Sequence, residues 1–245
     1  MLVLTSWDDG HSCDLRVAEM LAKYGLAGTF FVPVENREGL PVMNGAEIRE
    51  LDRNFEIGGH TLTHRYLRRI GLHEQRHEIV EGKRVIEDTV GHAIEGFCFP
   101  GGRFDAGVVR EVQDAGFRYA RTTENLMFKL GGDHWRLPTT LQFYPHGPEV
   151  LVKNALRYPK ASKFRLVLER VRERDFSKFV ENLAMLCARS GQIFHIWGHS
   201  WELEKEQLWP SLDVFLRCLS SLATRSLTLA EVVHAQGTSG KQVRT

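Results

Sequence analysis

The sequence predicts a single α/β domain of parallel strands covered by helices, and it favours a closed barrel. Short apolar runs alternate with amphipathic helical patterns along most of the chain, which is typical of parallel strands joined by helices. The 245 residues are enough for one α/β barrel. Unusual polar residues follow several of the strands, where a barrel gathers its site. A doubly wound sheet is the alternative, but the placement of these residues favours the barrel.

In the first half of the chain, five apolar runs predict strands and four patterns between them predict helices. The helical patterns place apolar residues three or four apart, as at Leu15, Ala18 and Ala22, and this first one stops at Gly25. The expected strands are Met1–Thr5, Gly28–Val34, one that starts at Phe55, 94–100 and 117–123. The expected helices are Asp14–Tyr24, a short helix from an Asn44 cap to Leu51, Leu72–Val90 and Ala106–Ala115.

In the second half, the pattern is looser between Leu141 and Ser190, where only a helix over Phe176–Arg189 stands out. A late strand is expected in "GQIFHIWGH" at 191–199. The charges of 165–175 alternate in sign, which indicates a solvated helix face rather than a nucleic-acid patch. We expect the barrel to span residues 1–235, followed by a polar, frayed tail at 236–245.

Composition excludes several classes of partner. The formal net charge of +1 gives no electrostatic reason for binding nucleic acid or a membrane surface. No run approaches the roughly 18 apolar residues of a membrane span, and no signal-peptide pattern precedes the first strand. The four cysteines form no CxxC pair and are expected to be reduced thiols. A cytoplasmic protein is therefore expected.

Two carboxylates and two histidines form the most informative group. Asp8 and Asp9 follow the first strand, and "HTLTH" places His60 and His64 four residues apart. Two histidines and one carboxylate are a standard ligand set for a catalytic divalent metal. A helical metalloprotease motif would need glutamate directly after the first histidine, and this chain has Thr61 there.

The adjacent carboxylates suggest a division of labour. Neighbouring residues of a strand point to opposite faces, so Asp8 and Asp9 are poorly placed to bind one metal together. One of them can bind the metal while the other takes a proton from the metal-bound water, whose pKa falls from 15.7 toward about 7. This arrangement is typical of a hydrolase.

Three motifs carry a family resemblance. "TSWDDG", "HTLTH" and "FCFPGGRFD" resemble, in order and spacing, the first three motifs of the polysaccharide deacetylase family, also called the NodB homology domain or carbohydrate esterase family 4. The resemblance runs from about Leu4 to about His199. It implies a distorted (β/α)7 barrel and a metal-dependent hydrolase.

The resemblance also assigns roles to individual residues. It implies that Asp8 is the general base and that Asp9, His60 and His64 bind the metal, with zinc the metal expected from these ligand types. The last family motif supplies a histidine that protonates the leaving amine.

Two histidines of the late strand are candidates for that acid. His195 and His199 share a strand face, but only His199 lies at the carboxyl end, where the barrel opens. We therefore predict that His199 is the acid, and that His195 is a core residue with hydrogen bonds inside the barrel.

The third motif departs from the family pattern RxPY. Cys98 occupies the arginine position and Gly101 the tyrosine position. Arg103 or Arg121 is expected to supply the missing cation beside the base, and the Gly101 backbone N–H is expected to face the developing oxyanion. Trp135, in "GGDHWRLP", is a candidate for the acyl pocket.

The predicted function is removal of an N-acyl group, chiefly acetyl, from a sugar or glycan. The predicted partners are therefore a divalent metal, Zn2+ first, and a carbohydrate or other N-acylated small molecule. Two alternatives stay open: a hydrolase of a non-sugar or cyclic amide on the same metal site, and a barrel that binds carbohydrate without turnover. The absent RxPY arginine favours the second of these.

Overall fold

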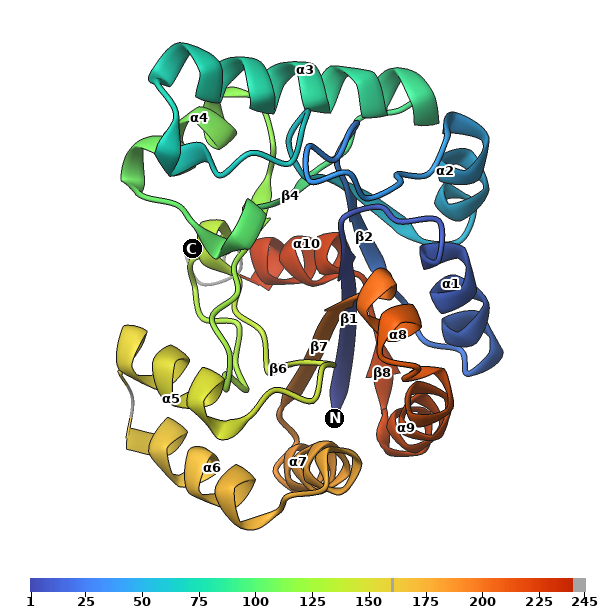
Figure 1. The fold of residues 1–245 in the computed structure, drawn as a ribbon, viewed down its shortest axis with the longest axis vertical. Helices are drawn as coiled ribbons and strands as arrows, with labels where there is room; N and C mark the ends of the chain where they lie inside the picture. Colours follow the sequence, from blue (N-terminus) through green and yellow to red (C-terminus); the bar gives the residue numbers. More distant parts are fainter. Residues whose placement is uncertain (160, 240–245) are drawn as a thin grey trace.

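The computed structural model describes residues 1–159 and 161–239, and its described strands form one parallel sheet that curls into an open barrel with helices around its outside (Figure 1). The order in the sheet is β5-β4-β3-β2-β1-β7-β6, and β8 pairs with β1 in addition. The distorted (β/α)7 barrel predicted from the sequence is thereby confirmed. The strands are β1 (Leu2–Asp8), β2 (Thr29–Val32), β3 (Glu56–Gly59), β4 (Gly96–Cys98), β5 (Tyr119–Arg121), β6 (Leu141–Gln142), β7 (Ile193–His199) and β8 (Arg225–Ser226).

Most of the helices connect strands over the outer face of the sheet. Helix α1 is an example: it buries an apolar stripe in which Val17 and Leu21 are fully buried. The α-helices are α1 (Asp14–Lys23), α2 (Gly45–Asp52), α3 (Leu72–Val90), α4 (Ala106–Asp114), α5 (Pro148–Arg157), α6 (Ala161–Arg172), α7 (Phe176–Arg189), α8 (Ser200–Lys205), α9 (Trp209–Leu222) and α10 (Leu229–Ser239). Three short 3-10 turns complete the described elements: η1 (Leu67–Arg69), η2 (Pro100–Gly102) and η3 (His134–Arg136).

Strand β1 decides which residues face the inside of the barrel. Val3 and Trp7 are buried in the cluster between sheet and helices, whereas Leu4 belongs to the inner cluster. Because side chains alternate along a strand, Asp8 shares the inner face with Leu4. β1 extends three residues beyond the predicted Met1–Thr5, because β7 pairs with it as far as Asp8 and His199.

The gap in the curled sheet lies between β5 and β6. The segment before β6 partly fills this gap: Leu137 forms an isolated parallel bridge with Arg121, and the Thr140 N–H donates to the backbone oxygen of His195. The two strands at the gap are short, which is why the barrel is distorted.

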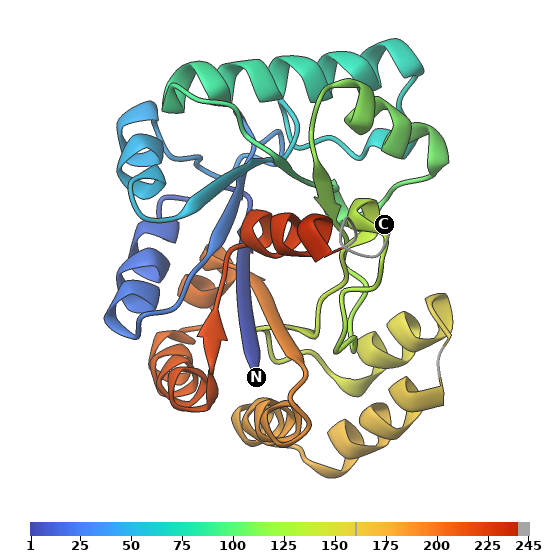
Figure 2. The same ribbon diagram turned by 180° about the vertical axis from the view of Figure 1, so that it is seen from behind.

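Helix α10 closes the end of the barrel opposite the polar residues. It crosses behind the strands in Figure 1 and lies in front of them in Figure 2. Leu229, Val232 and Val233 pack on inner residues such as Phe31 and Tyr119. The helix continues to Ser239, so residues 236–239 of the predicted tail are helical, and residues 240–245 lie outside the described part of the chain.

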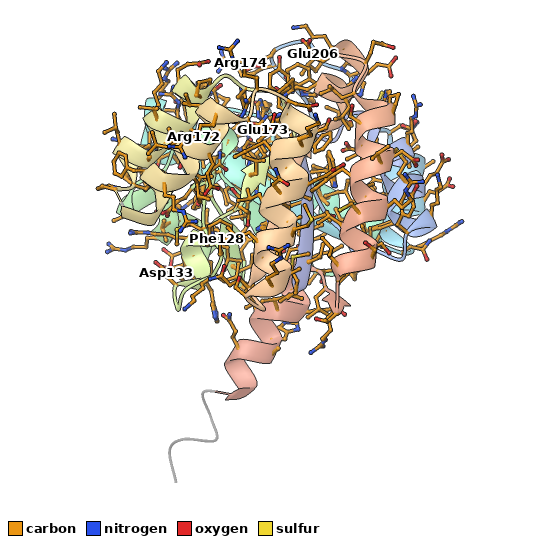
Figure 3. The ribbon with its side chains drawn as sticks, turned by 90° about the horizontal axis from the view of Figure 1, so that it is seen from below. Phe128, Asp133, Arg172, Glu173, Arg174 and Glu206 are labelled. Atoms are coloured by element: carbon orange, nitrogen blue, oxygen red, sulfur yellow. The ribbon has the colours of Figure 1, made fainter. Side chains whose placement is uncertain are left out.

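The loosely patterned region contains β6, α5 and α6, which the sequence analysis did not resolve, and the predicted helix at Phe176–Arg189 is α7. Arg165 pairs with Glu169 on α6 at 3.2 Å, and Arg172 and Arg174 at its end are exposed (Figure 3). This agrees with a solvated face. None of the helices in the described ranges is long and apolar enough to cross a membrane. All four cysteines are free.

Candidate active site

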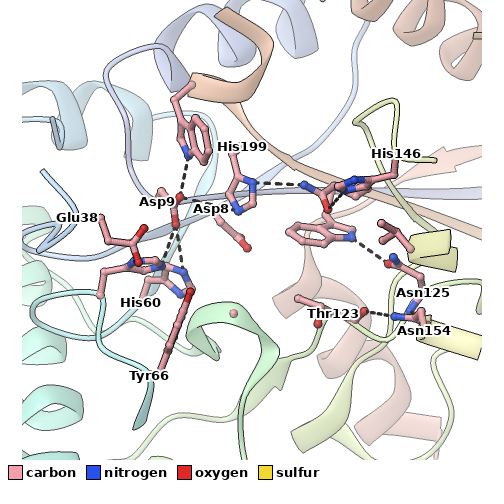
Figure 4. A pocket seen from close by; sticks show the side chains of 16 residues that line it. Asp8, Asp9, Glu38, His60, Tyr66, Thr123, Asn125, His146, Asn154 and His199 are labelled. Atoms are coloured by element: carbon pink, nitrogen blue, oxygen red, sulfur yellow. Dashed lines mark hydrogen bonds and ion pairs between the residues drawn. The ribbon is translucent and has the colours of Figure 1, made fainter. Parts of the chain in front are cut away.

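The carboxyl ends of the strands surround a cavity of about 350 Å³ (Figure 4). It is lined by most of the residues singled out from the sequence, namely Asp8, Asp9, His60, His64, Gly101 and His199. Arg121 and Arg103 are not part of the lining. The predicted position of the site, at the barrel mouth, therefore agrees with the geometry.

Asp9 is at the centre of this group. Its Oδ1 lies 3.5 Å from His60 Nε2 and 3.2 Å from His64 Nε2, and its Oδ2 accepts a hydrogen bond from Trp201 Nε1 at 2.8 Å. Burial raises the pKa of Asp9, but His199, His60 and His64 outweigh burial and hold that pKa well below its usual range. The carboxylate is therefore ionised and directed at two imidazoles.

The backbone at these residues is unusual. Asp9 has φ 76° and His64 has φ 55°, both in the left-handed region that non-glycine residues rarely adopt. Gly10 follows with φ 60°, and a Cβ there would lie 2.7 Å from Val32 Cγ1, so no other residue fits. Such conformations cluster at functional sites because the surrounding structure must stabilise them.

Three atoms of this group fit a divalent metal. One ligand atom each from Asp9, His60 and His64 lies within 4.8 Å of the others. The Nδ1–H of His60 donates to the backbone oxygen of Cys98 at 2.8 Å, which leaves its Nε2 lone pair facing Asp9. Asp9 Oδ1 is buried and has no hydrogen-bond partner in the described chain. A buried anion with a free oxygen beside two imidazole nitrogens is a suitable ligand set.

A second group also has its possible ligand atoms within 4.8 Å of one another, namely Asp8, His60 and Cys98. Burial raises the pKa of the Cys98 thiol well above its usual value, so the thiolate that would bind a metal is disfavoured. Asp8 is already paired with Arg121. The group around Asp9 is therefore the better metal site.

Helix α3 fixes the loop that carries the two histidines. Glu78 is buried and accepts hydrogen bonds from the Thr63 N–H at 2.8 Å and the Thr63 hydroxyl at 2.6 Å, and its own backbone oxygen accepts from the Leu62 N–H at 2.8 Å. One turn later, a Cβ at Gly82 would lie 2.6 Å from the Thr61 carbonyl carbon. The sequence analysis missed both residues, although an acid and a glycine on the buried face of a helix were a usable signal.

Arg121 provides the cation beside Asp8. Its Nη2 pairs with Asp8 Oδ1, and Cys98 Sγ lies 3.6 Å from Asp8 Oδ2. Arg103, the other candidate, is exposed and stacks over the Tyr66 ring at 5.2 Å, so its proposed role beside Asp8 is not supported by its position. The guanidinium missing from the Cys98 position is thus supplied from the neighbouring strand.

Two aromatic rings help to hold Arg121 in place. It is fully buried, with its guanidinium carbon 4.8 Å from the centre of the Trp197 ring and 5.4 Å from that of Phe31. Burial lowers the pKa of Arg121, but the charge of Asp8 outweighs it, and the pKa is raised. The side chain is a permanent positive charge under the cavity.

His199 faces the cavity from the end of β7. Its Nδ1–H donates to Glu202 Oε2 at 2.7 Å, its Nε2 lies 3.9 Å from Asp9 Oδ2, and its ring stacks on Trp201 with centroids 5.6 Å apart. Burial lowers the pKa of His199, but Asp9 and the bond to Glu202 raise it to about 9. Both carboxylates therefore favour the protonated form of the imidazole.

His195 lies deeper in the barrel and has different partners. Its Nε2 lies 2.9 Å from Ser6 Oγ and its Nδ1 lies 3.0 Å from the backbone oxygen of Pro138. Burial, together with the charge of Arg121, lowers the pKa of His195 to about 3. It is a neutral core residue without access to the cavity.

Comparison with known proteins gives the family. A family model described as "Polysaccharide deacetylase" matches residues 1–120, which include β1 and the HTLTH and FCFPGG motifs. The chain belongs to the polysaccharide deacetylase family. Its enzyme class follows from the family: it is a hydrolase, a carbohydrate N-deacetylase.

Solved structures show that the fold likeness to polysaccharide deacetylases extends over the whole chain. The chitin deacetylase of Colletotrichum lindemuthianum is 18% identical with a TM-score of 0.61, and the match covers 94% of this chain and 86% of that one. The carbohydrate esterase domain of a xylanase from the Trinervitermes trinervoides hindgut metagenome is 17% identical with a TM-score of 0.58, covering 96% and 91%. A family pseudoenzyme of Bacillus anthracis is 17% identical with a TM-score of 0.57, covering 95% and 65%.

Three residues in or beside the cavity of this polysaccharide deacetylase were not among the predicted site residues. Trp197 and Trp201 line the cavity, and Glu202, which does not line it, orients His199. Their common signal was the stretch "HIWGHSWE", in which a carboxylate follows the histidine by three residues, one helical turn into α8. Trp135 does not line the cavity and packs instead against the core.

Proposed function

We propose that this polysaccharide deacetylase removes the acetyl group from an N-acetylated sugar with the help of a divalent metal. One observation carries the proposal: a single cavity contains a three-residue metal ligand set, a carboxylate beside a fixed cation, and an imidazole held by a carboxylate. Hydrolysis of an amide needs these three components, because water must be activated, the oxyanion stabilised and the amine protonated.

Asp9, His60 and His64 would hold the metal, and their two nitrogens and one oxygen favour zinc. When bound, a divalent cation lowers the pKa of water and polarises the carbonyl oxygen. The bond from His60 Nδ1 to the Cys98 backbone fixes the ring so that Nε2 faces Asp9.

Asp8 would take the proton from the attacking water. It ends β1 on the inner face of the sheet, lines the cavity and lies next in sequence to the ligand Asp9. Arg121 and Cys98 contact its carboxylate from the core side, so the side chain is held in one orientation. The Arg121–Asp8 pair supports turnover over binding alone, because it places a guanidinium beside Asp8 although the RxPY arginine is absent.

His199 would protonate the leaving amine. Glu202 accepts from its Nδ1–H, so the Nε2 proton is directed into the cavity. Gly101 lines the opposite wall against Tyr66, and its backbone N–H is our candidate donor to the carbonyl oxygen.

The cavity suits a sugar better than an extended apolar amide. The rings of Tyr66, Trp197 and Trp201 offer flat apolar faces for a sugar ring, and the side chains of Asn125 and Asn154 add polar groups nearby. A non-sugar amide is the alternative that the assay below distinguishes.

The test combines metal analysis with acetate release from N-acetylated oligosaccharides and from simple amides. Asp9→Ala and His64→Ala are expected to lose the metal, whereas Asp8→Asn keeps the metal and loses about 10²- to 10⁴-fold in kcat. His77→Ala, at an exposed histidine of α3, is the matched control for metal content. Full turnover in Asp8→Asn would contradict the base assignment, and acetate release from simple amides alone would contradict a sugar substrate.

A further inference from the structure

A second cavity, of about 480 Å³, is lined by four arginines: Arg68, Arg69, Arg103 and Arg157. They come from three separate parts of the chain. Arg68 and Arg69 lie on η1, Arg103 follows η2, and Arg157 is the last residue of α5. We call this cavity the arginine subsite.

Most of the positive charge in the arginine subsite is not neutralised. Arg68 pairs with Asp105 at 3.2 Å. In the described chain, the other three arginines have no carboxylate within 4.0 Å: Arg69 and Arg103 lie over one aromatic ring at 5.3 and 5.2 Å, and Arg157 donates to a backbone oxygen at 3.1 Å. Guanidinium groups that converge without an anion repel one another, so a bound anion would be stabilised.

The aromatic ring under Arg69 and Arg103 is that of Tyr66, which also lines the catalytic cavity. Tyr66 lies in edge contact with the His64 ring, with centroids 6.4 Å apart. Arg157 donates to Gly102, the neighbour of the proposed oxyanion donor Gly101. A substrate that crosses the Tyr66 ring would therefore place its amide at the metal ligands and an adjacent group at the arginines.

We propose that the arginine subsite binds a phosphate group attached to the N-acetylated sugar, so that the substrate is a phosphorylated saccharide. The proposal rests on the deacetylase function proposed above. Phosphate is favoured over a carboxylate because its multiple oxygens can each accept from a guanidinium, and three free arginines exceed the charge of one carboxylate. All four arginines are exposed, so the far side of the phosphate can carry a nucleotide or a lipid.

Binding is tested first, with inorganic pyrophosphate as the probe and isothermal titration calorimetry of the metal-loaded protein. The variant Arg69→Gln/Arg103→Gln removes two arginines that have no carboxylate within 4.0 Å in the described ranges and lie over the Tyr66 ring. The control Arg84→Gln/Arg165→Gln makes the same charge change at two exposed arginines that pair within their own helices. The native protein and both variants carry the same metal. A difference in their Kd for pyrophosphate therefore reports on the arginine subsite.

We expect the Kd for pyrophosphate to rise about 10-fold or more in Arg69→Gln/Arg103→Gln and to change less than 2-fold in the control. Equal weakening in both variants would show a non-specific charge effect and overturn the proposal. Tighter binding of glucuronate than of pyrophosphate would replace phosphate by a carboxylate.

Turnover is the second arm. Acetate release is compared for N-acetylglucosamine, its 1-phosphate, and its nucleoside diphosphate and lipid diphosphate esters. We expect kcat/KM at least 10-fold higher for a phosphorylated sugar, with that preference lost in Arg69→Gln/Arg103→Gln; the best ester identifies the source of the phosphate. Equal kcat/KM for the free and the phosphorylated sugar would contradict the phosphate subsite but would still support the deacetylase function. Arginine-dependent pyrophosphate binding with no acetate release from any sugar would support an anion site at the arginines and contradict the deacetylase function.

Discussion

Replacing Arg121 by methionine should destabilise the fold through Asp8. The guanidinium is fully buried and Asp8 is 3% exposed, so each charge loses its main compensating partner when the other is removed. Two unit charges about 4 Å apart interact by about 4 kcal/mol at an effective dielectric constant of 20. Removal of one partner from a buried pair typically costs about 3–5 kcal/mol. We expect Arg121→Met to lower the free energy of unfolding by this amount.

A double-mutant cycle isolates the pair. Urea unfolding is measured for the native sequence, Arg121→Met, Asp8→Asn and the double variant, with a chelator present so that metal binding does not contribute. We expect the double variant to lose less than the sum of the two single variants, with a coupling of about 2 kcal/mol or more. Additive effects within about 0.5 kcal/mol would refute the view that Arg121 acts mainly on Asp8. Loss of Arg121 packing on Trp197 would then be the main cause.

Three further changes test the surroundings of the site. Glu202→Gln should lower kcat about 10-fold or more at constant metal content, because His199 loses the acceptor that orients its proton; an unchanged kcat would remove that role. Gly82→Ala should weaken metal binding and lower Tm, because the new Cβ meets the Thr61 backbone at 2.6 Å; unchanged metal affinity by titration would show that the loop adapts. Burial raises the pKa of Asp14 well above its value in the unfolded chain, so the folded state retains a proton that the unfolded state releases from about pH 4 upward. The free energy of unfolding should therefore fall by up to about 1.4 kcal/mol per pH unit in that window. Asp14→Asn should reduce this dependence of the free energy of unfolding on pH. An unchanged dependence, measured by unfolding at several pH values, would contradict the role of Asp14.

The residues proposed as metal ligands, base and acid could be located from sequence because each lies in a short motif. Two facts are enough to place four of these residues together: their spacing within each motif, and the rule that the carboxyl ends of parallel strands meet at one edge of the sheet. The four are Asp8, Asp9, His60 and His64. His199 could be chosen over His195 as the proposed acid because only His199 lies at the carboxyl end of the strand. Asp8, Asp9, His60, His64 and His199 line the cavity, whereas His195 is buried and does not line it.

The choice between Arg121 and Arg103 could not be made from sequence, because it depends on strand register. In the parallel pairing of β4 with β5, Cys98 lies opposite Arg121, so both side chains face the inside of the barrel at one level. Arg121 on β5 can therefore place its guanidinium where an arginine at position 98 on β4 would have placed one. Glu202 was missed for a related reason, since helix α8 was not predicted and its first turn brings the carboxylate back to His199.

The place of β1 in the sheet has a consequence for synthesis of the chain. Its Leu2–Asp8 segment has β2 on one side and β7 on the other, with Leu2 opposite Ile193 and Asp8 opposite His199. At about 5–20 residues per second, the β7 partner leaves the ribosome about 10–40 s after β1. Until then one edge of β1 has no β7 to pair with, and an unpaired edge favours aggregation. Nascent chains should therefore depend on chaperones until His199 emerges, when β7 can pair with the open edge of β1 and His199 reaches the catalytic cavity.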